Sequence, residues 1–352
     1  MCLPMNNDAK KLIDRLASEH SLPKEDYAFL VRAQDGETAA YAGALAAGVR
    51  REVYGTDVYI RGLIEIGNIC RNDCLYCGIR RSNTHADRYR LTEDEIFECA
   101  CEGYTLGFRT FVMQGGEDGA FGVDSICRTV SRIKRKFPDC AVTLSLGEFP
   151  REDYEAMFAA GADRYLLRHE TADRTHYEKL HPAQMSFDNR MRCLRDLKDI
   201  GYQTGCGFMV GSPYQTARTL AEDLKFIEEF RPEMCGIGPF IPQKDTPFRD
   251  FPAGTCEQTV YLLSLLRLIQ PNLLLPATTA LGTIRPDGRE RGLQAGANVV
   301  MPNLSPLGVR KKYALYDGKL CTGEEAAQCI GCLSRRVQSV GANIVIDRGD
   351  VK

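Results

Sequence analysis

From residue 59 onward, short apolar runs alternate with longer segments in which apolar residues recur every three or four positions. The short runs have the composition of buried strands, and the longer segments have the period of amphipathic helices. Eight runs are candidate strands: 59–67, 110–116, 141–148, 164–170, 203–211, 233–240, 273–280 and 298–302. Eight apolar strands separated by helices favour a parallel sheet, and eight is the number that closes a barrel. The pattern predicts an α/β fold, a (β/α)8 TIM barrel over residues 57–305.

The segments between and before the strands have the signals of helices. Helical patterns fit 8–20, 25–33, 36–52, 124–136, 151–160, 187–199, 216–230, 257–269 and 287–295. A further helix is expected after Thr92, which forms a predicted capping box with Glu95. We expect residues 1–56 to form an N-terminal helical segment and residues 306–352 a C-terminal extension that packs on the barrel. A doubly wound open sheet is the alternative, but cysteines stand where its glycine fingerprint would follow the first strand.

Composition narrows the class of protein. The 352 residues are 44% hydrophobic and 26% charged, with a formal net charge of -2 and no block of like charges, so we expect no nucleic-acid partner. No run approaches the roughly 20 apolar residues of a membrane helix, and the first residues lack the apolar region of a signal peptide, so we expect a cytoplasmic protein without membrane contact. The 15 cysteines are scattered along the chain and cluster only at 70–77 and 321–332, which indicates reduced thiols and metal ligation rather than disulfides.

Three cysteines lie within eight residues directly after the first predicted strand. Cys70, Cys74 and Cys77 occupy the stretch CRNDCLYCG. Thiolates suit iron–sulfur clusters or zinc, and this spacing can wrap three corners of a cube, which leaves a fourth iron open to another ligand. In a barrel the loop would open onto the catalytic face, where the carboxyl ends of the strands meet. A zinc site completed by His85 or by a distant cysteine is the alternative.

Two other predicted strand ends carry polar groups. Gln114-Gly115-Gly116-Glu117 follows the second strand, where bare glycine backbone lets a ligand approach and the side-chain oxygens can accept from an ammonium group. An ordinary turn is the alternative for this stretch. The fourth strand is unusually charged, and because buried charges are seldom unpaired, its charged residues must meet each other or a charged ligand.

The cysteine motif, with Tyr76 before its third cysteine, resembles the cluster motif of the radical S-adenosylmethionine (SAM) superfamily. The resemblance implies a 4Fe-4S cluster on three cysteines, with SAM chelating the fourth iron and being cleaved to a 5′-deoxyadenosyl radical. It implies that Glu170 binds the ribose or ammonium group and that Arg190 clamps the carboxylate of SAM. The residues expected to bind this cofactor are Tyr76, Gln114, Gly115, Gly116, Glu117, Thr143, Glu148, Arg168, Glu170, Arg190, Met209 and Ile241.

Longer stretches resemble one family within this superfamily, the FeFe-hydrogenase maturase HydE family. They include RGLIEIGNICRNDCLYCGIRRSN, RYLLRHETAD and PATTALGT. The resemblance implies a closed barrel with SAM at the top and a second small-molecule site deeper inside, lined by Arg164, Thr278, Thr279, Met301 and Tyr313 or Tyr316. It also implies a cysteine-bound Fe(CO)2(CN) substrate, the maturases HydG and HydF as partners, and ferredoxin or flavodoxin as electron donor. Gly115 departs from the family pattern, which commonly has Ser there, so no hydroxyl can act at this position.

A second cysteine group lies near the end of the chain. Cys321, Cys329 and Cys332 resemble an accessory cluster motif found in some family members, which implies a possible second iron–sulfur cluster. Three rival functions stay open on the sequence alone. They are biotin synthase, which the strand-four sequence disfavours, methylornithine synthase, and a non-catalytic carrier of metal or clusters.

Overall fold

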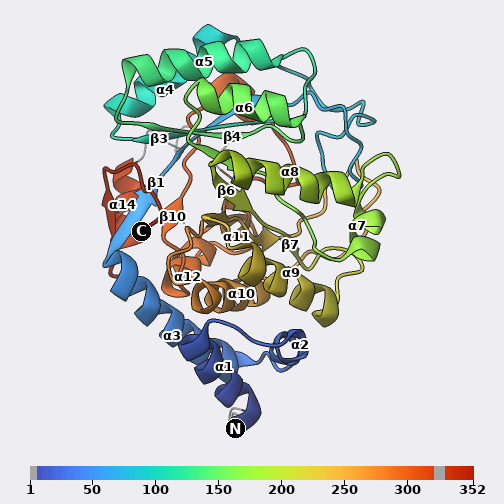
Figure 1. Ribbon diagram of the computed structural model, residues 1–352, viewed down its shortest axis with the longest axis vertical. Coiled ribbons are helices and arrows are strands. Elements are labelled where there is room, and N and C mark those ends of the chain that lie inside the picture. Colours follow the sequence, from blue (N-terminus) through green and yellow to red (C-terminus); the bar gives the residue numbers. More distant parts are fainter. Residues whose placement is uncertain (1–5, 321–329) are drawn as a thin grey trace.

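The computed structural model describes residues 6–320 and 330–352 and has a parallel barrel at its centre (Figure 1). The strands are β1 (Asp57–Ile60), β2 (Gly62–Gly67), β3 (Thr110–Gly115), β4 (Ala141–Ser145), β5 (Arg164–Leu166), β6 (Gln203–Cys206), β7 (Met209–Val210), β8 (Met234–Cys235), β9 (Gly238–Pro239), β10 (Val299–Val300) and β11 (Asn343–Val345). Its main sheet runs β2-β3-β4-β5-β6-β8, and every neighbouring pair is parallel.

Isolated backbone bridges complete the ring between β8 and β2. Met234 in β8 bridges to Leu274, Pro276 bridges to Val299 in β10, and Asn303 bridges to Leu63 in β2, all in parallel. The sequence predicts a strand over residues 273–280. These residues, all of them described, make only the isolated bridges at Leu274 and Pro276, because Pro276 has no backbone N–H to donate. The predicted strand 59–67 is divided into β1 and β2 at Arg61. The predicted (β/α)8 barrel is confirmed, and its wall is less regular than expected between β8 and β2.

Helices surround the barrel. They are α1 (Asn7–Glu19), α2 (Lys24–Arg32), α3 (Gly36–Tyr54), α4 (Glu93–Thr105), α5 (Val123–Lys136), α6 (Arg151–Ala159), α7 (Arg174–Leu180), α8 (Phe187–Ile200), α9 (Ala217–Phe230), α10 (Cys256–Ile269), α11 (Thr279–Ile284), α12 (Gly288–Gln294), α13 (Leu307–Arg310) and α14 (Ile330–Gln338). The capping box of Thr92 and Glu95 is present at the start of α4. Each barrel helix buries its apolar stripe against the strands, which forms one continuous core.

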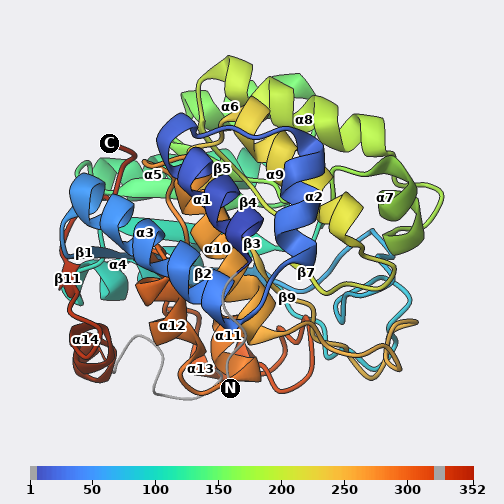
Figure 2. The same cartoon turned by 90° about the horizontal axis from the view of Figure 1, so that it is seen from below.

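The N-terminal helices pack against the barrel's own helices at one end of the molecule. In Figure 1 they lie at the bottom, and Figure 2, seen from below, shows them in front of the strands. The hydroxyl of Tyr27 in α2 donates to Glu228 in α9 at 2.6 Å, and the hydroxyl of Tyr261 in α10 donates to the carbonyl of Leu30 at 3.2 Å. The boundary at residue 56 stays a prediction.

The C-terminal end of the chain returns to the amino end of the barrel. Strand β11 pairs in parallel with β1, from Asp57 with Asn343 to Tyr59 with Val345. The last residues then pass beneath the strands, where Gly349 has a positive φ of 62° and a Cβ would lie 2.7 Å from the ring of Tyr59. The tail therefore caps the barrel at the end opposite the cysteine loop.

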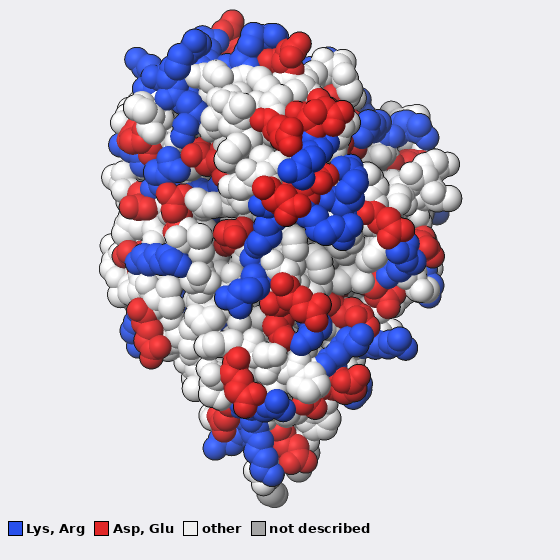
Figure 3. Space-filling view, in the orientation of Figure 1, with Lys and Arg blue, Asp and Glu red and all other residues white. Residues whose placement is uncertain are grey.

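No helix within the described residues is long and apolar enough to cross a membrane. On the face in Figure 3, acidic and basic side chains are interspersed. Many charged side chains of the described residues form ion pairs, such as Arg151 with Asp196.

Candidate active site

The cysteine loop follows β2 at the carboxyl end of the barrel, as the sequence predicts. Three neighbouring segments hold its backbone. The N–H of Arg71 donates to the carbonyl of Glu117 at 2.9 Å, that of Leu75 to Leu180 at 3.0 Å, and that of Gly78 to Leu315 at 2.9 Å. The loop is therefore fixed by the segments that follow β3, β5 and β10, which fold against it from far along the chain.

The three thiols are half-buried and unpaired in disulfides. Burial raises the pKa of each, that of Cys77 to about 12, and neighbouring thiols add to the shift at Cys74. Thiols in this environment become thiolates only when a cation replaces their protons, which is the chemistry of a metal ligand.

The arrangement of the cysteines suits a cluster better than a single ion. Within residues 6–320 and 330–352, no three Cys, His, Asp or Glu side chains converge as ligands of one metal ion would. In a cubane each thiolate binds a different iron, so its ligands need not converge on one point. The geometry disfavours the zinc alternative and fits a 4Fe-4S cluster on Cys70, Cys74 and Cys77.

The turn after β3 packs directly on the cysteine loop. A Cβ at Gly116 would lie 2.3 Å from the carbonyl oxygen of Ile69 and 2.7 Å from the Cβ of Cys70, so only glycine fits. Glu117 pairs with Arg71 at 3.0 Å and accepts from the N–H of Glu148 at 3.1 Å. Burial raises the pKa of the Glu117 carboxyl. The predicted Gly-Gly motif thus has a structural reason at Gly116, and its role toward SAM stays a prediction.

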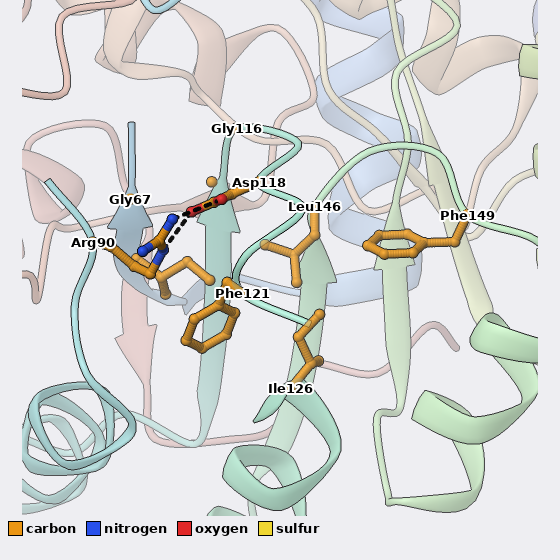
Figure 4. Close-up of a pocket in the computed structure, with 10 residues that line it drawn as sticks. Gly67, Arg90, Gly116, Asp118, Phe121, Ile126, Leu146 and Phe149 are labelled. Carbon is orange, nitrogen blue, oxygen red and sulfur yellow. Dashed lines mark hydrogen bonds and ion pairs between the residues drawn. The ribbon is translucent and has the colours of Figure 1, made fainter. Parts of the chain in front are cut away.

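A small cavity lies behind this turn, shown in Figure 4. It is lined mainly by apolar side chains, including Phe121 and Leu146, and the Arg90–Asp118 ion pair lies at its edge with one contact of 2.8 Å. Its volume of about 20 Å³ holds roughly one water molecule. The cavity is a packing space and is too small for a nucleoside.

Arg190 lies at the centre of a buried polar cluster beside the cysteine loop. Its Nε donates to Glu148 at 2.5 Å and its Nη1 donates to the carbonyl of Arg168 at 2.8 Å. Glu148 also accepts from the side-chain amide of Asn189 at 2.5 Å. Asn189 and Arg190 are consecutive residues of α8, and Glu148 comes from the segment after β4. The predicted carboxylate clamp is therefore engaged with protein groups in this structure.

Several buried polar atoms of the barrel have no hydrogen-bond partner within the described chain, and the one on Thr143 lies in the middle of β4, level with Arg164. They are Nε and Nη2 of Arg168, Oε2 of Glu170, and Oγ1 of Thr143 and Thr278. The Nη2 of Arg168 lies 3.3 Å from Oε2 of Glu170, which is a weak ion pair. Buried donors and acceptors are seldom left unpaired, so their presence on three strand segments indicates a place for a polar ligand.

Arg164 lies elsewhere. It stands at the amino end of β5, fully buried, where its guanidinium donates to Thr110 at 3.0 Å, to the carbonyl of Arg348 at 2.9 Å and to Asp350 at 2.6 Å. Arg168 comes four residues later, beyond the end of β5 at Leu166. The C-terminal tail satisfies the guanidinium of Arg164, and the role of Arg164 in lining a substrate cavity stays a prediction.

The other predicted residues are spread over the barrel interior and its mouth. Tyr313 is buried and accepts from the amide of Gln114 at 3.2 Å, and Tyr316 is half-buried nearby in sequence. The hydroxyl of Tyr76 donates to Nε2 of His181, 3.1 Å away, because Nδ1 of that ring faces the carbonyl of Tyr177. The remaining predicted positions are Gly115 at the end of β3, Thr279 at the start of α11, Met209 in β7, Ile241 after β9 and Met301 after β10.

Sequence reasoning missed an interior ion pair. The carboxylate of Glu65 in β2 is 1% exposed and is bound by the ammonium of Lys319 and by the amide of Asn303 at 2.9 Å. The available signal was the single carboxylate in the otherwise apolar run GLIEIG, because a buried charge requires a partner. Its partner could not be read from the sequence.

The C-terminal cysteine group is only partly described. Cys332 lies exposed on α14, where Arg335 approaches its sulfur at 3.3 Å. Cys321 and Cys329 lie outside the described residues.

The chain is similar to several known proteins. Residues 64–227 match the radical SAM superfamily. The chain is 48% identical over 297 residues to the FeFe-hydrogenase maturase subunit HydE of Thermotoga maritima, covering 84% of each chain. It is 27% identical over 336 residues to 3-methylornithine synthase of Methanosarcina acetivorans, covering 95% of this chain and 93% of that one. A crystal structure of methylornithine synthase superposes with a TM-score of 0.82 at 25% identity, over 95% of this chain and 97% of the other.

Proposed function

The chain belongs to the HydE family of FeFe-hydrogenase maturases, within the radical SAM superfamily, and we propose that its substrate is a cysteine-bound Fe(CO)2(CN) complex. It is a radical SAM enzyme of hydrogenase maturation. The observation that carries the substrate proposal is Arg168, whose side chain is 33% exposed and whose buried Nε and Nη2 have no hydrogen-bond partner in the described chain beyond the 3.3 Å contact of Nη2 with Glu170. A guanidinium binds a carboxylate with two parallel hydrogen bonds, and a cysteine-derived ligand supplies that carboxylate.

The residues divide into a cofactor group and a substrate group. Cys70, Cys74 and Cys77 would hold the 4Fe-4S cluster, and its chemistry is the reductive cleavage of SAM to methionine and a 5′-deoxyadenosyl radical. Arg190 and Glu148, next to the cysteine loop, would bind the charged end of SAM, with Glu148 giving up part of its contact to Arg190. The Gln114–Glu117 turn and Glu170 would accept from its amino and hydroxyl groups.

Deeper groups would hold the substrate. Oγ1 of Thr143 and of Thr278 are buried donors on different strand segments of the ring, and both lack a hydrogen-bond partner in the described residues. Together with Arg168 they provide hydroxyl and guanidinium donors, which suit a small anion. A ligand bound between these groups would be shielded from water by the barrel wall, which would protect a reactive radical from quenching.

The first experiment tests the cofactor chemistry. Anaerobically reconstituted protein with dithionite and SAM should release 5′-deoxyadenosine, and Cys77→Ser should abolish the release. Cys256→Ser is the matched control, because Cys256 is a buried cysteine of α10, away from the loop. Wild-type protein with a full cluster and no SAM cleavage would support the carrier alternative.

The second experiment tests the substrate. The product of HydG, supplied with SAM and reductant, should yield an adenosylated or otherwise altered iron complex, detected by mass spectrometry and infrared bands of the diatomic ligands. The amino-acid substrate of methylornithine synthase should be left unchanged. Turnover of the amino acid alone would replace this proposal with the methylornithine synthase reaction, which the 27% identity to that enzyme makes the natural competitor.

Two finer proposals concern cofactors and partners. We propose that Cys321, Cys329 and Cys332 bind an accessory iron–sulfur cluster that SAM cleavage does not require. Cys332→Ser should then lower the iron content and leave 5′-deoxyadenosine release intact.

We also propose that HydG supplies the substrate, that HydF receives the product, and that ferredoxin or flavodoxin is the electron donor.

A further inference from the structure

The backbone at Glu170 has a left-handed conformation at the carboxyl end of β5. Its φ is 65°, and among the described residues only His20, Tyr214 and Arg231 are other non-glycine residues with positive φ. His20 and Arg231 close helices, where this conformation is common. Glu170 does not end a helix, so the surrounding contacts must hold its backbone there.

One set of these contacts comes from the strand segment next to it. The N–H of Glu170 donates to the carbonyl of Gly207 at 3.0 Å, and the N–H of Gly207 donates back to Nδ1 of His169 at 3.2 Å. Gly207 is itself fixed, because a Cβ there would lie 2.0 Å from the carbonyl oxygen of Gly236. The ring of His169 therefore takes the place of a backbone acceptor next to the left-handed residue.

The second set comes from Asp223 on α9. Because Nδ1 of His169 accepts, its Nε2 carries the hydrogen, and this atom lies 3.4 Å from Oδ1 of Asp223. The same oxygen accepts from the N–H of Ala172 at 2.6 Å. Both side chains are fully buried, and the ring packs between Phe208 and Phe226. Asp223 thus contacts the chain on both sides of Glu170, through a hydrogen bond from Ala172 and a longer contact to the ring of His169.

The ionisation of the pair is consistent with a fixed, neutral ring. Burial lowers the pKa of His169 to about 3, so the imidazole stays uncharged at neutral pH. Burial also raises the pKa of the Asp223 carboxyl, which faces His176, Asp173 and Glu170 as well. His176 is satisfied by Thr171 and by the carbonyl of Pro213. The His169–Asp223 pair therefore suits a role in holding the backbone conformation at Glu170 better than a role in proton exchange with a ligand.

We propose that His169 and Asp223 are positioning residues, which hold the strained turn at Glu170 so that Arg168 and Glu170 present their unpartnered atoms to the ligands of the barrel. The three residues 168–170 then act as one unit, in which His169 is anchored by Gly207 and Asp223, and Arg168 and Glu170 carry charged groups that lie 3.3 Å apart. The proposal deepens the proposed function and rests on it for the identity of the ligands. A merely structural His–Asp pair would affect stability alone.

The test uses two substitutions at His169. His169→Asn places an amide oxygen near the position of Nδ1 and can still accept from the N–H of Gly207. His169→Phe fills the space and removes the acceptor. Reconstituted His169→Phe should raise the KM for SAM or for the iron substrate about 10- to 100-fold, with an intact cluster by iron content and a weakened SAM-induced change in the electron paramagnetic resonance signal. His169→Asn should recover most of the loss.

Controls separate positioning from stability. Tyr261→Phe removes a buried hydrogen bond far from the site and should lower the melting temperature without changing KM or the spectroscopic response. If His169→Phe behaves like Tyr261→Phe, the proposal is overturned. Should His169→Phe fail to fold, Asp223→Leu is the second variant, because it removes the one oxygen that faces both the N–H of Ala172 and Nε2 of His169. It should change KM in the same direction.

A crystal structure of the cofactor-free His169→Phe protein, or of Asp223→Leu if that variant alone folds, gives a readout independent of any ligand. The backbone of Glu170 should relax to negative φ, and the contact between Arg168 and Glu170 should open. An unchanged left-handed Glu170 overturns the proposal even if SAM cleavage is lost. Wild-type protein that does not cleave SAM would contradict the proposed function while this structural test still decides the role of His169 and Asp223.

Discussion

The ammonium of Lys319 binds the carboxylate of Glu65 inside the barrel, joining two residues 254 positions apart. Residues 311–319, the closing segment, reach this point across the cysteine loop. The amide of Asn68 donates to the carbonyl of Lys312 at 2.8 Å, and the N–H of Asp317 donates to the carbonyl of Pro242 at 3.2 Å. The ion pair therefore pins a segment that covers the mouth of the barrel.

Lys319→Met should destabilise the protein, and more so at high pH. Burial raises the pKa of the Glu65 carboxyl and Lys319 opposes that shift, so without the lysine the pKa of Glu65 rises further. Loss of a buried partner costs about 3–5 kcal/mol in the free energy of unfolding. This loss should be largest above the folded pKa of Glu65 and shrink below it, where the carboxyl is protonated. Chemical denaturation between pH 5 and pH 8 measures it.

The matched control for this prediction is Lys312→Met. Lys312 pairs with Asp87 on the surface, with both side chains substantially exposed, and such a pair contributes less than about 1 kcal/mol. Equal losses for the two lysine variants would contradict a stabilising role for the interior pair.

Asp350→Asn should lower stability at neutral pH without slowing SAM cleavage. Burial opposes ionisation of Asp350, but Arg348, Gln203 and Arg164 together hold the pKa of its carboxyl well below the usual value. A depressed folded pKa gives stability that is present above the unfolded pKa of about 3.9 and lost as the pH falls below it. The difference between wild type and variant should therefore be full at pH 7 and diminish below about pH 4, as followed by thermal melting.

Asp250→Asn is the matched control for Asp350→Asn, because the side chain of Asp250 is exposed at the surface. A reduced rate of 5′-deoxyadenosine release in Asp350→Asn, with unchanged cluster content, would contradict the placement of Arg164 and Asp350 away from the site.

Gly116→Ala should prevent cluster assembly. Its Cβ would collide with backbone of the cysteine loop at Ile69 and with Cys70, so the loop must move away from the turn after β3. Gly119→Ala, three residues later, meets no atom within 4 Å and is the matched control. Iron and sulfide analysis after anaerobic reconstitution should show a large loss for the first variant only. Full iron content in Gly116→Ala would show that the close packing is not needed.

Arg168→Gln should weaken substrate binding with little effect on folding. A hydrogen bond to a charged group contributes about 1.5–3 kcal/mol, so the KM for an anionic substrate should rise about 10- to 150-fold. The melting temperature of the ligand-free protein should change little, because two nitrogen atoms of this guanidinium have no hydrogen-bond partner in the described chain. Arg267→Met, by contrast, removes a fully buried guanidinium bound to the carbonyls of Gly296 and Pro271 and should lower the melting temperature strongly.

The sequence by itself determined the parts of this protein that depend on local pattern. Apolar runs alternating with amphipathic segments specify the parallel barrel, and the capping residues at Thr92 and Glu95 specify the start of α4. The cysteine spacing after the first strand places the cluster loop at the carboxyl end, because the topology of a barrel brings all such ends together.

Only the tertiary structure decided which charged residues meet. Arg164 lies in β5 and Arg168 two residues beyond its end, and no local pattern tells which of the two guanidinium groups the C-terminal tail satisfies. The pairs Glu65–Lys319 and His169–Asp223 join segments that no local pattern relates. Strand register decides how deep a side chain lies in the barrel. The C-terminal segments that close the two openings decide which distant charges pair. Both depend on the packing of the whole fold.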